Sequence, residues 1–243
     1  MAIDWVCFDW GDTLADIRGT YEEMNRDQWF YNTLQHFGVK IPLQEFDAAY
    51  NDLSRDVSVT MRGNVTRWQK GFFFHEMCHK LNFPITTEES SRMADYYGGH
   101  FISKLKLLPG AHDLIEFLGR KKVRLALISN ANGERVRQQL EFFKLNTYFS
   151  IILISDELGF DKSSNVPFER FLEHAKQIYP ETKPENCIMV GDRADEDAYA
   201  RNVGMKTIIV KRKHRLPSKD DLPFDFEVND LNELKVLLDK LSS

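Results

Sequence analysis

The sequence predicts an α/β fold, with a Rossmann-like parallel sheet in a three-layer α/β/α core that a helical insert interrupts. In the second half of the chain, short β-branched apolar runs alternate with segments of helical character. That alternation is typical of a parallel sheet covered on both faces. One similar run lies near the start of the chain, and residues 16–105 after it contain no convincing strand pattern. The insert therefore follows the first strand.

Each predicted element of the core is a short run with clear limits. The expected strands are Trp5–Phe8, Val123–Ile128, Ile151–Ile154, Cys187–Val190, Thr207–Val210 and a short Phe226–Val228. The expected helices between and after them are Glu134–Phe143, Val166–Tyr179, a segment through Asp197–Asn202, and the amphipathic Leu231–Leu241.

The insert is predicted to be helical. Phe30, Leu34 and Phe37 recur at helical spacing, and Gly38 follows as a stop signal. Because Thr86 and Glu89 have the spacing of a capping box, they indicate the start of a further helix. The remaining expected helices are Leu43–Val57 and Val65–Leu81.

The domain organisation follows from where the insert begins and ends. Pro109-Gly110 is a turn signal that marks the return to the sheet. We expect a core of residues 1–15 with 106–243 and a helical domain of residues 16–105.

Composition and charge exclude several classes of protein. A formal charge of −5 makes an extended nucleic-acid surface improbable, so no nucleic-acid partner is expected. No apolar run approaches the roughly 18 residues of a membrane helix, so no membrane partner is expected either. The three cysteines, Cys7, Cys78 and Cys187, are too few for a disulfide framework and indicate a reducing, cytoplasmic location. Monomer and homodimer both stay open.

Polar residues follow the predicted strands at their carboxyl ends, where open parallel sheets bind ligands. Carboxylates suit a magnesium ion, and a lysine with a hydroxyl suits phosphate oxygens. The pattern therefore predicts a magnesium and phosphate site. In chain order its residues are Asp9, Ser129 with Asn130, Lys162, and Asp192 with Glu196 and Asp197.

On these residues the chain resembles the haloacid dehalogenase-like hydrolase superfamily. Its first motif corresponds to D-W-G-D-T-L at 9–14, its second to Ser129, its third to Lys162 in G-F-D-K, and its fourth to G-D-x-x-x-x-D at 191–197. Four motifs in order are far more specific than any one. A helical insert after the first motif is similar to the subfamily I members, whose α-helical cap domain closes over the site.

The resemblance implies a role for each residue. Asp9 would be the nucleophile of a phosphatase and form an aspartyl-phosphate that water hydrolyses. Ser129, Asn130 and Lys162 would bind substrate. Magnesium would be held by Asp9, the Gly11 carbonyl and Asp192, with Asp197, and as a weaker candidate Glu196, acting through water.

The chain departs from the family pattern at the second acid of the first motif. Family phosphatases carry there an acid that protonates the leaving group, and here the position is Gly11, with the acid displaced to Asp12. General acid–base help is worth roughly 10²–10⁴-fold. Activity is therefore slow, or leaving groups are good, or Asp12 takes over the catalytic role.

Three further features have competing interpretations. His75–His79 spells H-E-x-x-H, but no third zinc ligand follows at the expected spacing, which favours a structural helix. The basic run Lys211–Arg215 is expected to be a solvated loop, with recruitment of an anionic substrate as the alternative. Trp10 either shapes the pocket or packs in the interior, and Arg18 is expected at the surface.

The sequence thus predicts a magnesium-dependent phosphatase-like hydrolase of small phosphorylated metabolites. A haloacid dehalogenase is one alternative, because those relatives also lack the second acid, although they need no magnesium. A phosphonate hydrolase is disfavoured because Phe46–Ser54 lacks the lysine that those enzymes use. The alternative of another class is a non-catalytic, phosphate-sensing or partner-binding protein.

Overall fold

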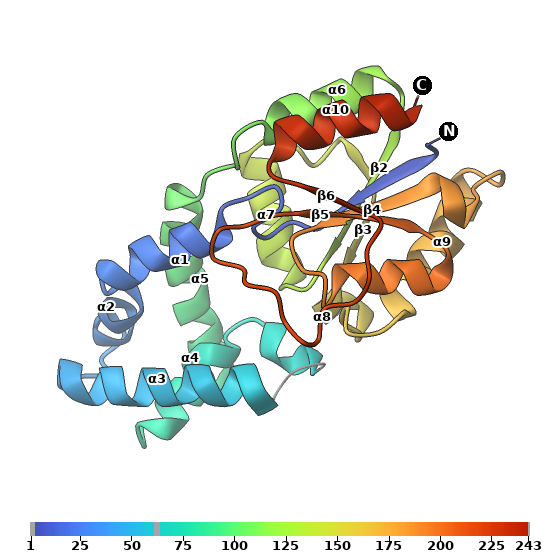
Figure 1. The fold of residues 1–243 in the computed structure, drawn as a ribbon. Helices are drawn as coiled ribbons and strands as arrows, with labels where there is room; N and C mark the ends of the chain where they lie inside the picture. Colours follow the sequence, from blue (N-terminus) through green and yellow to red (C-terminus); the bar gives the residue numbers. More distant parts are fainter. Residues whose placement is uncertain (1–2, 61–63, 243) are drawn as a thin grey trace. The chain divides into compact units, whose positions relative to one another are not determined.

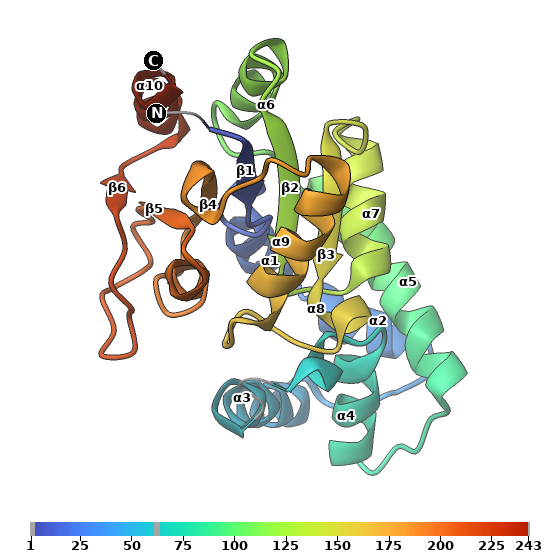
Figure 2. The ribbon, with the colours of Figure 1, turned by 90° about the vertical axis from the view of Figure 1, so that its right-hand side faces the viewer.

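The computed structural model describes residues 3–60 and 64–242, and it has an α/β fold built on one parallel sheet. The sheet has six strands in the order β3-β2-β1-β4-β5-β6, and every neighbouring pair is parallel. Figure 2 shows the six strands side by side, with β1 near the middle. The Rossmann-like α/β prediction is confirmed.

The strands lie where apolar runs predict them, with small shifts at their ends. β3 begins two residues before the predicted Ile151, because Phe149 already pairs with Leu125 of β2. The strands are β1 (Trp5–Phe8), β2 (Arg124–Ser129), β3 (Phe149–Ile154), β4 (Cys187–Gly191), β5 (Lys206–Val210) and β6 (Phe226–Val228).

Helices cover both faces of this sheet. Helices α6 and α10 lie side by side on one face, and α9 lies on the other (Figure 1). The segment predicted as a helix through Asp197–Asn202 is the 3-10 helix η3. The elements of the core besides the strands are α6 (Ala111–Arg120), α7 (Gly133–Phe142), α8 (Ser155–Leu158), α9 (Val166–Ile178), η2 (Pro184–Asn186), η3 (Asp197–Val203) and α10 (Leu231–Ser242).

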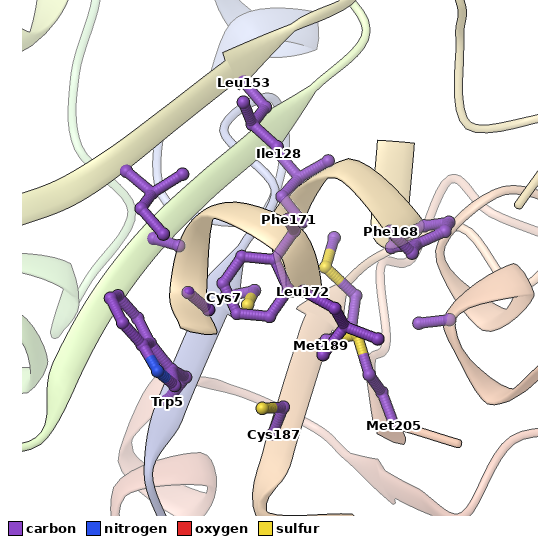
Figure 3. Packing of buried hydrophobic residues seen from close by; sticks show 14 residues of the cluster. Trp5, Cys7, Ile128, Leu153, Phe168, Phe171, Leu172, Cys187, Met189 and Met205 are labelled. Atoms are coloured by element: carbon purple, nitrogen blue, oxygen red, sulfur yellow. The ribbon is translucent and has the colours of Figure 1, made fainter. Parts of the chain in front are cut away.

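Strand residues alternate between the two faces, and one set packs under α9. Trp5 and Cys7 of β1 lie there with Met189 of β4, and Phe171 of α9 meets the Trp5 ring edge-on at 5.6 Å between centroids. Figure 3 shows this cluster, including Cys187. Burial raises the pKa of the Cys7 thiol and raises that of Cys187 to about 12. Both cysteines are therefore small buried residues of the core.

The chain separates into two compact units, Met1–Ile17 with Lys106–Ser243 and Arg18–Leu105, here called the core unit and the helical unit. The described part of the helical unit contains helices and no strand. Its elements are α1 (Ile17–Arg26), α2 (Trp29–His36), α3 (Leu43–Thr60), η1 (Val65–Trp68), α4 (Phe72–Lys80) and α5 (Thr87–Lys104).

One helix prediction in this unit was wrong. The expected Val65–Leu81 helix is divided, because Gly71 has a φ of +80°, which no α-helix accommodates. A Cβ at Gly71 would lie 2.8 Å from Ser90, so close packing against α5 also requires glycine there. The capping box of Thr86 and Glu89 is confirmed at the start of α5.

The H-E-x-x-H residues lie on α4 with both histidines exposed. His75 contacts only its neighbour Glu76 in the recorded ion pairs, at 3.1 Å. Within the described residues, no three metal-binding side chains that include His75 or His79 come together. α4 instead packs through Phe74, whose ring stacks on Phe30 at 4.2 Å.

No described helix combines the length and apolar character needed to cross a bilayer.

We expect Phe171→Ala to lower the free energy of unfolding of the protein by about 3–5 kcal/mol, because the change removes a fully buried ring and leaves a cavity. Ile178→Ala, on the same helix but half exposed, should change it by less than about 1 kcal/mol. Urea unfolding of the full chain measures both. Similar losses from the two variants would contradict the packing described for α9.

Candidate active site

The polar residues at the carboxyl ends of the strands come together because β1 lies between β2 and β4. Asp9 follows β1, and its backbone N–H donates to the Val190 carbonyl of β4 at 2.8 Å. Ser129 is the last residue of β2, and Asp192 directly follows β4. All three are buried. The strand order reverses at β1, the position where sheets of this kind bind ligands.

Lys162 is the centre of the site. Its side chain is 2 % exposed, and its ammonium lies 2.7 Å from Asp9 Oδ1 and 2.5 Å from Asp197 Oδ1. Burial alone would lower the pKa of this lysine, but the carboxylates of Asp197, Asp9 and Glu196 outweigh burial and hold the pKa above its ordinary value. Lys162 is therefore charged throughout the physiological range, and Asp9 faces a permanent cation.

The position of Asp197 depends on the absence of a side chain at Gly191. A Cβ at Gly191 would lie 1.9 Å from Asp197 Oδ2, so any other residue would push this carboxylate out of place. The same oxygen, Asp197 Oδ2, accepts the backbone N–H of Arg193 at 2.9 Å. The G-D pair that ends β4 therefore has two functions: glycine makes room for Asp197, and Asp192 follows at the rim.

Asp192 differs from Asp9 and Asp197 because it forms no ion pair with a basic side chain among the described residues. Among the described residues, no lysine, arginine or histidine forms an ion pair with it within 4.0 Å. Burial raises the pKa of Asp192, and the carboxylates of Asp9 and Asp197 raise it further, while the charge of Arg215 opposes them. Asp192 also interacts electrostatically with Arg212. A buried carboxylate surrounded by other acids favours a bound cation.

Asn130 and Glu196 link the loops around this cluster. Asn130 donates its amide N–H to Glu196 Oε2 at 2.8 Å, and its Oδ1 accepts the backbone N–H of Lys162 at 2.9 Å. Glu196 also pairs with Arg193 at 2.9 Å. Both ends of the Asn130 side chain are thus bonded to protein. Sequence reasoning selected Asn130 for substrate binding, and the structure shows that its side chain positions Lys162.

The loop of the first motif is tightly closed. The N–H groups of Leu14 and Ala15 both donate to the Trp10 carbonyl at 3.0 Å, and that of Asp12 donates to the Ala15 carbonyl at 2.7 Å. Asp12 has a φ of +55°, in the left-handed region that suits glycine. Among the described residues, no donor reaches the Gly11 carbonyl.

Trp10 packs in the interior of the core unit. Its indole N–H donates to Gln139 Oε1 of α7 at 2.6 Å, and its ring lies 6.4 Å from that of Phe143. Arg18 is exposed and pairs with Glu22 one helical turn away, as expected of a surface arginine. Neither residue is part of the acidic cluster.

The expectation of a solvated loop at Lys211–Arg215 is only partly correct. Lys211, Lys213 and His214 are exposed, but three residues of the run contact the first-motif loop or Asp195. Arg212 donates from Nε to the Asp12 carbonyl and from Nη2 to the Thr13 carbonyl, the latter at 3.1 Å. His214 Nε2 lies 3.8 Å from Asp12 Oδ2, and Arg215 lies 3.3 Å from Asp195. Sequence reasoning missed them. The only available signal was their density of basic residues directly after a predicted strand.

The donors in this cluster fit a hard divalent cation. Asp9 and Asp192 offer carboxylate oxygens, and Gly11 offers a carbonyl without a donor among the described residues. Ligand atoms of Asp12, Asp192 and His214 also lie within 4.8 Å of one another. Oxygen donors of this kind suit Mg²⁺. Each Asp197 oxygen already accepts a hydrogen bond, so this acid acts mainly on Lys162 and Arg193.

A family model for haloacid dehalogenase-like hydrolases matches residues 3–204. The chain therefore belongs to the haloacid dehalogenase-like hydrolases. The resemblance of its four motifs to that family is confirmed.

Curated relatives include several phosphatases. The chain is 27% identical over 209 residues to a glyceraldehyde 3-phosphate phosphatase of Pyrococcus furiosus, covering 85% of this chain and 80% of the relative. It is 29% identical to the enzyme of that name from Methanothermobacter thermautotrophicus, over 96% of this chain and 98% of the relative. A pyrimidine 5′-nucleotidase of Escherichia coli is 26% identical, over 99% of this chain and all of the relative.

Solved structures share the fold along nearly the whole chain. A HAD-hydrolase from Bacillus subtilis bound to magnesium superposes with a TM-score of 0.70 at 17% identity, covering 98% of this chain and 99% of the other. A 2-haloacid dehalogenase from Pseudomonas syringae superposes with a TM-score of 0.65 at 24% identity, over the same shares. At these identities the likeness concerns the fold.

The burial of acids in the site predicts how stability depends on pH. Burial raises the pKa of Asp192 and of Glu196 in the folded chain, so the folded state binds these protons more tightly than the unfolded state. Their contribution to stability is complete below about pH 4, near the ordinary carboxyl pKa, and is lost as the pH rises through the raised values. We expect the unfolding free energy, measured in urea with a chelator present, to fall from mildly acidic to neutral pH.

Asp192→Asn is the matched variant for this experiment. Because it removes one of the two carboxylates, it should be more stable than the wild type at neutral pH and show a shallower pH dependence. A variant with an unchanged or steeper dependence would contradict the environment described for Asp192.

Proposed function

We propose that this chain is a magnesium-dependent phosphatase that hydrolyses small phosphorylated metabolites through an aspartyl-phosphate on Asp9. One observation carries the proposal. The Asp9 carboxylate is buried at a strand end, hydrogen-bonded to the Lys162 ammonium at 2.7 Å, and adjacent to Asp192, which has no cation of its own. A carboxylate held in a fixed position thus lies beside a second acid without a cationic partner, as a nucleophile with an adjacent metal site requires.

Asp9 is the nucleophile in this proposal. Its Oδ2 oxygen, which accepts only a long 3.5 Å hydrogen bond from the Thr13 hydroxyl, attacks phosphorus in line as the bond from phosphorus to the ester oxygen breaks. The step leaves a mixed anhydride on Asp9, and the departing alkoxide takes a proton from water to give the alcohol. Water then attacks the phosphorus of the anhydride, so phosphate leaves and the Asp9 carboxylate is restored.

Lys162 and Ser129 serve the phosphoryl group. A lysine ammonium has three donors, and Asp9 and Asp197 take two of them, which leaves one N–H for a phosphoryl oxygen. Ser129 is buried at the end of β2, and its hydroxyl has no recorded hydrogen bond with the described residues, so this hydroxyl is available as well. The Asn130 side chain fixes the position of the Lys162 backbone by accepting its N–H.

Asp9, Asp192 and the Gly11 carbonyl would hold the magnesium ion, with Asp197 contributing through water. When bound, the ion supplies positive charge that lets a carboxylate approach a phosphate dianion. Without a cation, Asp9 and Asp192 would both repel the substrate.

The class of substrate is supported by the relatives. Glyceraldehyde 3-phosphate phosphatase and pyrimidine 5′-nucleotidase are names of enzymes that act on small phosphate esters, and both align over most of this chain. We therefore propose a small phosphate monoester as substrate.

The test is a screen of small phosphate esters with Mg²⁺ or with a chelator. Wild type should release phosphate only with Mg²⁺, and Asp9→Asn should reduce turnover by at least about 10³-fold while remaining folded, because the amide cannot attack phosphorus. Near-normal turnover by folded Asp9→Asn would overturn the mechanism. Turnover of a 2-haloacid in the presence of chelator would favour the dehalogenase alternative, and stable phosphorylation of Asp9 without release would favour the phosphate-sensing one.

The order of Gly11 and Asp12 predicts a second, selective effect. A Cβ at Gly11 would meet only Ile17, at 3.4 Å, so the position has room for a side chain, and Asp12 occupies a backbone conformation that suits glycine. Gly11→Asp combined with Asp12→Gly should therefore be tolerated and supply the family's general acid. Since an alkoxide needs a proton to leave and a nitrophenolate does not, kcat/KM should rise at least about 10-fold more for alkyl than for aryl phosphates.

The matched control is Asp12→Asn alone. If wild type hydrolyses alkyl phosphates well and Asp12→Asn removes that activity, Asp12 is the acid and the double variant has nothing to restore. Equal changes for both substrate types in a folded double variant would mean that protonation of the leaving group is not limiting.

A further inference from the structure

Arg212 contacts a loop that lies about 200 positions before it in the chain. It follows β5, and its guanidinium donates to two successive carbonyls of the first-motif loop, those of Asp12 and Thr13. The two donors, Nε and Nη2, lie on one edge of the guanidinium, so the pair fixes the direction of both carbonyls and not only their distance.

The first-motif loop requires stabilising contacts at Asp12, because this residue has a left-handed backbone conformation. A residue other than glycine in the left-handed region costs about 1 kcal/mol or more, so the conformation persists only where its surroundings hold it. Here the Asp12 N–H donates to Ala15 at 2.7 Å, its carbonyl accepts from Arg212, and its carboxylate lies 3.8 Å from His214. Two of these three contacts come from the segment after β5.

The acceptors of Arg212 are neutral. Among the described residues, no carboxylate forms an ion pair with it within 4.0 Å, whereas Arg215 pairs with Asp195 and Lys211 with Glu227. Lys213, next to it in the chain, is exposed and has no recorded partner among those residues. The guanidinium of Arg212 thus acts on backbone geometry, and Lys213 carries the same charge with no such contact.

We propose that Arg212 is a positioning residue that holds the backbone at residues 11–13 so that the Gly11 carbonyl and the Asp9 carboxylate can bind a divalent cation together. The proposal rests on the metal site of the proposed function. The Gly11 carbonyl and the Asp12 nitrogen belong to the same peptide unit. Rotation of the Asp12 backbone would therefore turn the Gly11 carbonyl away from Asp9 and Asp192.

The competing role for Arg212 is attraction of a second anionic group on the substrate. A lysine substituted at position 212 could perform one of these roles but not the other. Lys at 212 keeps the charge and would restore attraction, but it has no fork to hold two carbonyls. Loss of attraction raises KM and depends on salt, whereas loss of positioning weakens metal binding without any substrate present.

The experiment measures Mg²⁺ binding to the full chain by isothermal titration calorimetry, with kcat and KM as second readouts. Arg212→Gln should weaken Mg²⁺ binding by about 10- to 100-fold, the usual effect of a residue that orients a metal ligand. Arg212→Lys should weaken Mg²⁺ binding by at least about 5-fold, while Lys213→Gln should bind Mg²⁺ as tightly as the wild type does. In an Asp12→Gly background, the loss caused by Arg212→Gln should be smaller, since glycine adopts the left-handed conformation unaided.

The outcomes separate this inference from the proposed function. Wild type that binds no Mg²⁺ overturns the proposed function, and the inference with it. Wild type that binds Mg²⁺ while Arg212→Gln or Arg212→Lys binds equally well overturns the inference alone, and a KM increase restored by lysine then assigns Arg212 to substrate attraction. If Arg212→Gln weakens Mg²⁺ binding equally in the wild type and in the Asp12→Gly background, the inference is also overturned. If Arg212→Gln does not fold, Arg212→Lys decides by the same criterion.

Discussion

The buried ammonium of Lys162 sets the arrangement of the whole site. An ammonium removed from water costs several kcal/mol unless charges of opposite sign surround it, and Asp9 and Asp197 supply them at 2.7 and 2.5 Å. Those two carboxylates belong to different strand ends, so the charge balance ties the end of β1 to the end of β4. Loss of Lys162 would leave both carboxylates with buried, uncompensated charge.

The remaining features of the site follow from this balance. Gly191 lacks a side chain where Asp197 must lie, and Asn130 holds the Lys162 backbone by a hydrogen bond of 2.9 Å. Lys162 cannot neutralise every neighbouring acid, and the excess negative charge is concentrated at Asp192. The structure thus combines two carboxylates held by Lys162 with a third that has no cationic partner, and in the proposed function this third acid would attract the metal ion.

What the sequence could predict was set by how local each signal is. The strands and the acids that follow them are visible because apolar runs and strand ends are local patterns, and parallel strands bring their ends to one edge. The contact of Arg212 with Asp12 is invisible to such reasoning, because it joins residues far apart and its acceptors are backbone carbonyls that every residue carries. The break at Gly71 was missed for a similar reason, since glycine is required there by Ser90 of another helix.

The central place of β1 in the sheet has a consequence for how the chain acquires its structure during synthesis. Both partners of β1 are made late: β2 begins at Arg124 and β4 at Cys187. The apolar segment Trp5–Phe8 therefore leaves the ribosome long before anything can pair with it, and the contiguous helical unit, Arg18–Leu105, is complete in the interval. The order of synthesis places an exposed, strand-forming segment ahead of a unit that can fold first. During synthesis, β1 should consequently be a binding site for chaperones until both β2 and β4 have emerged.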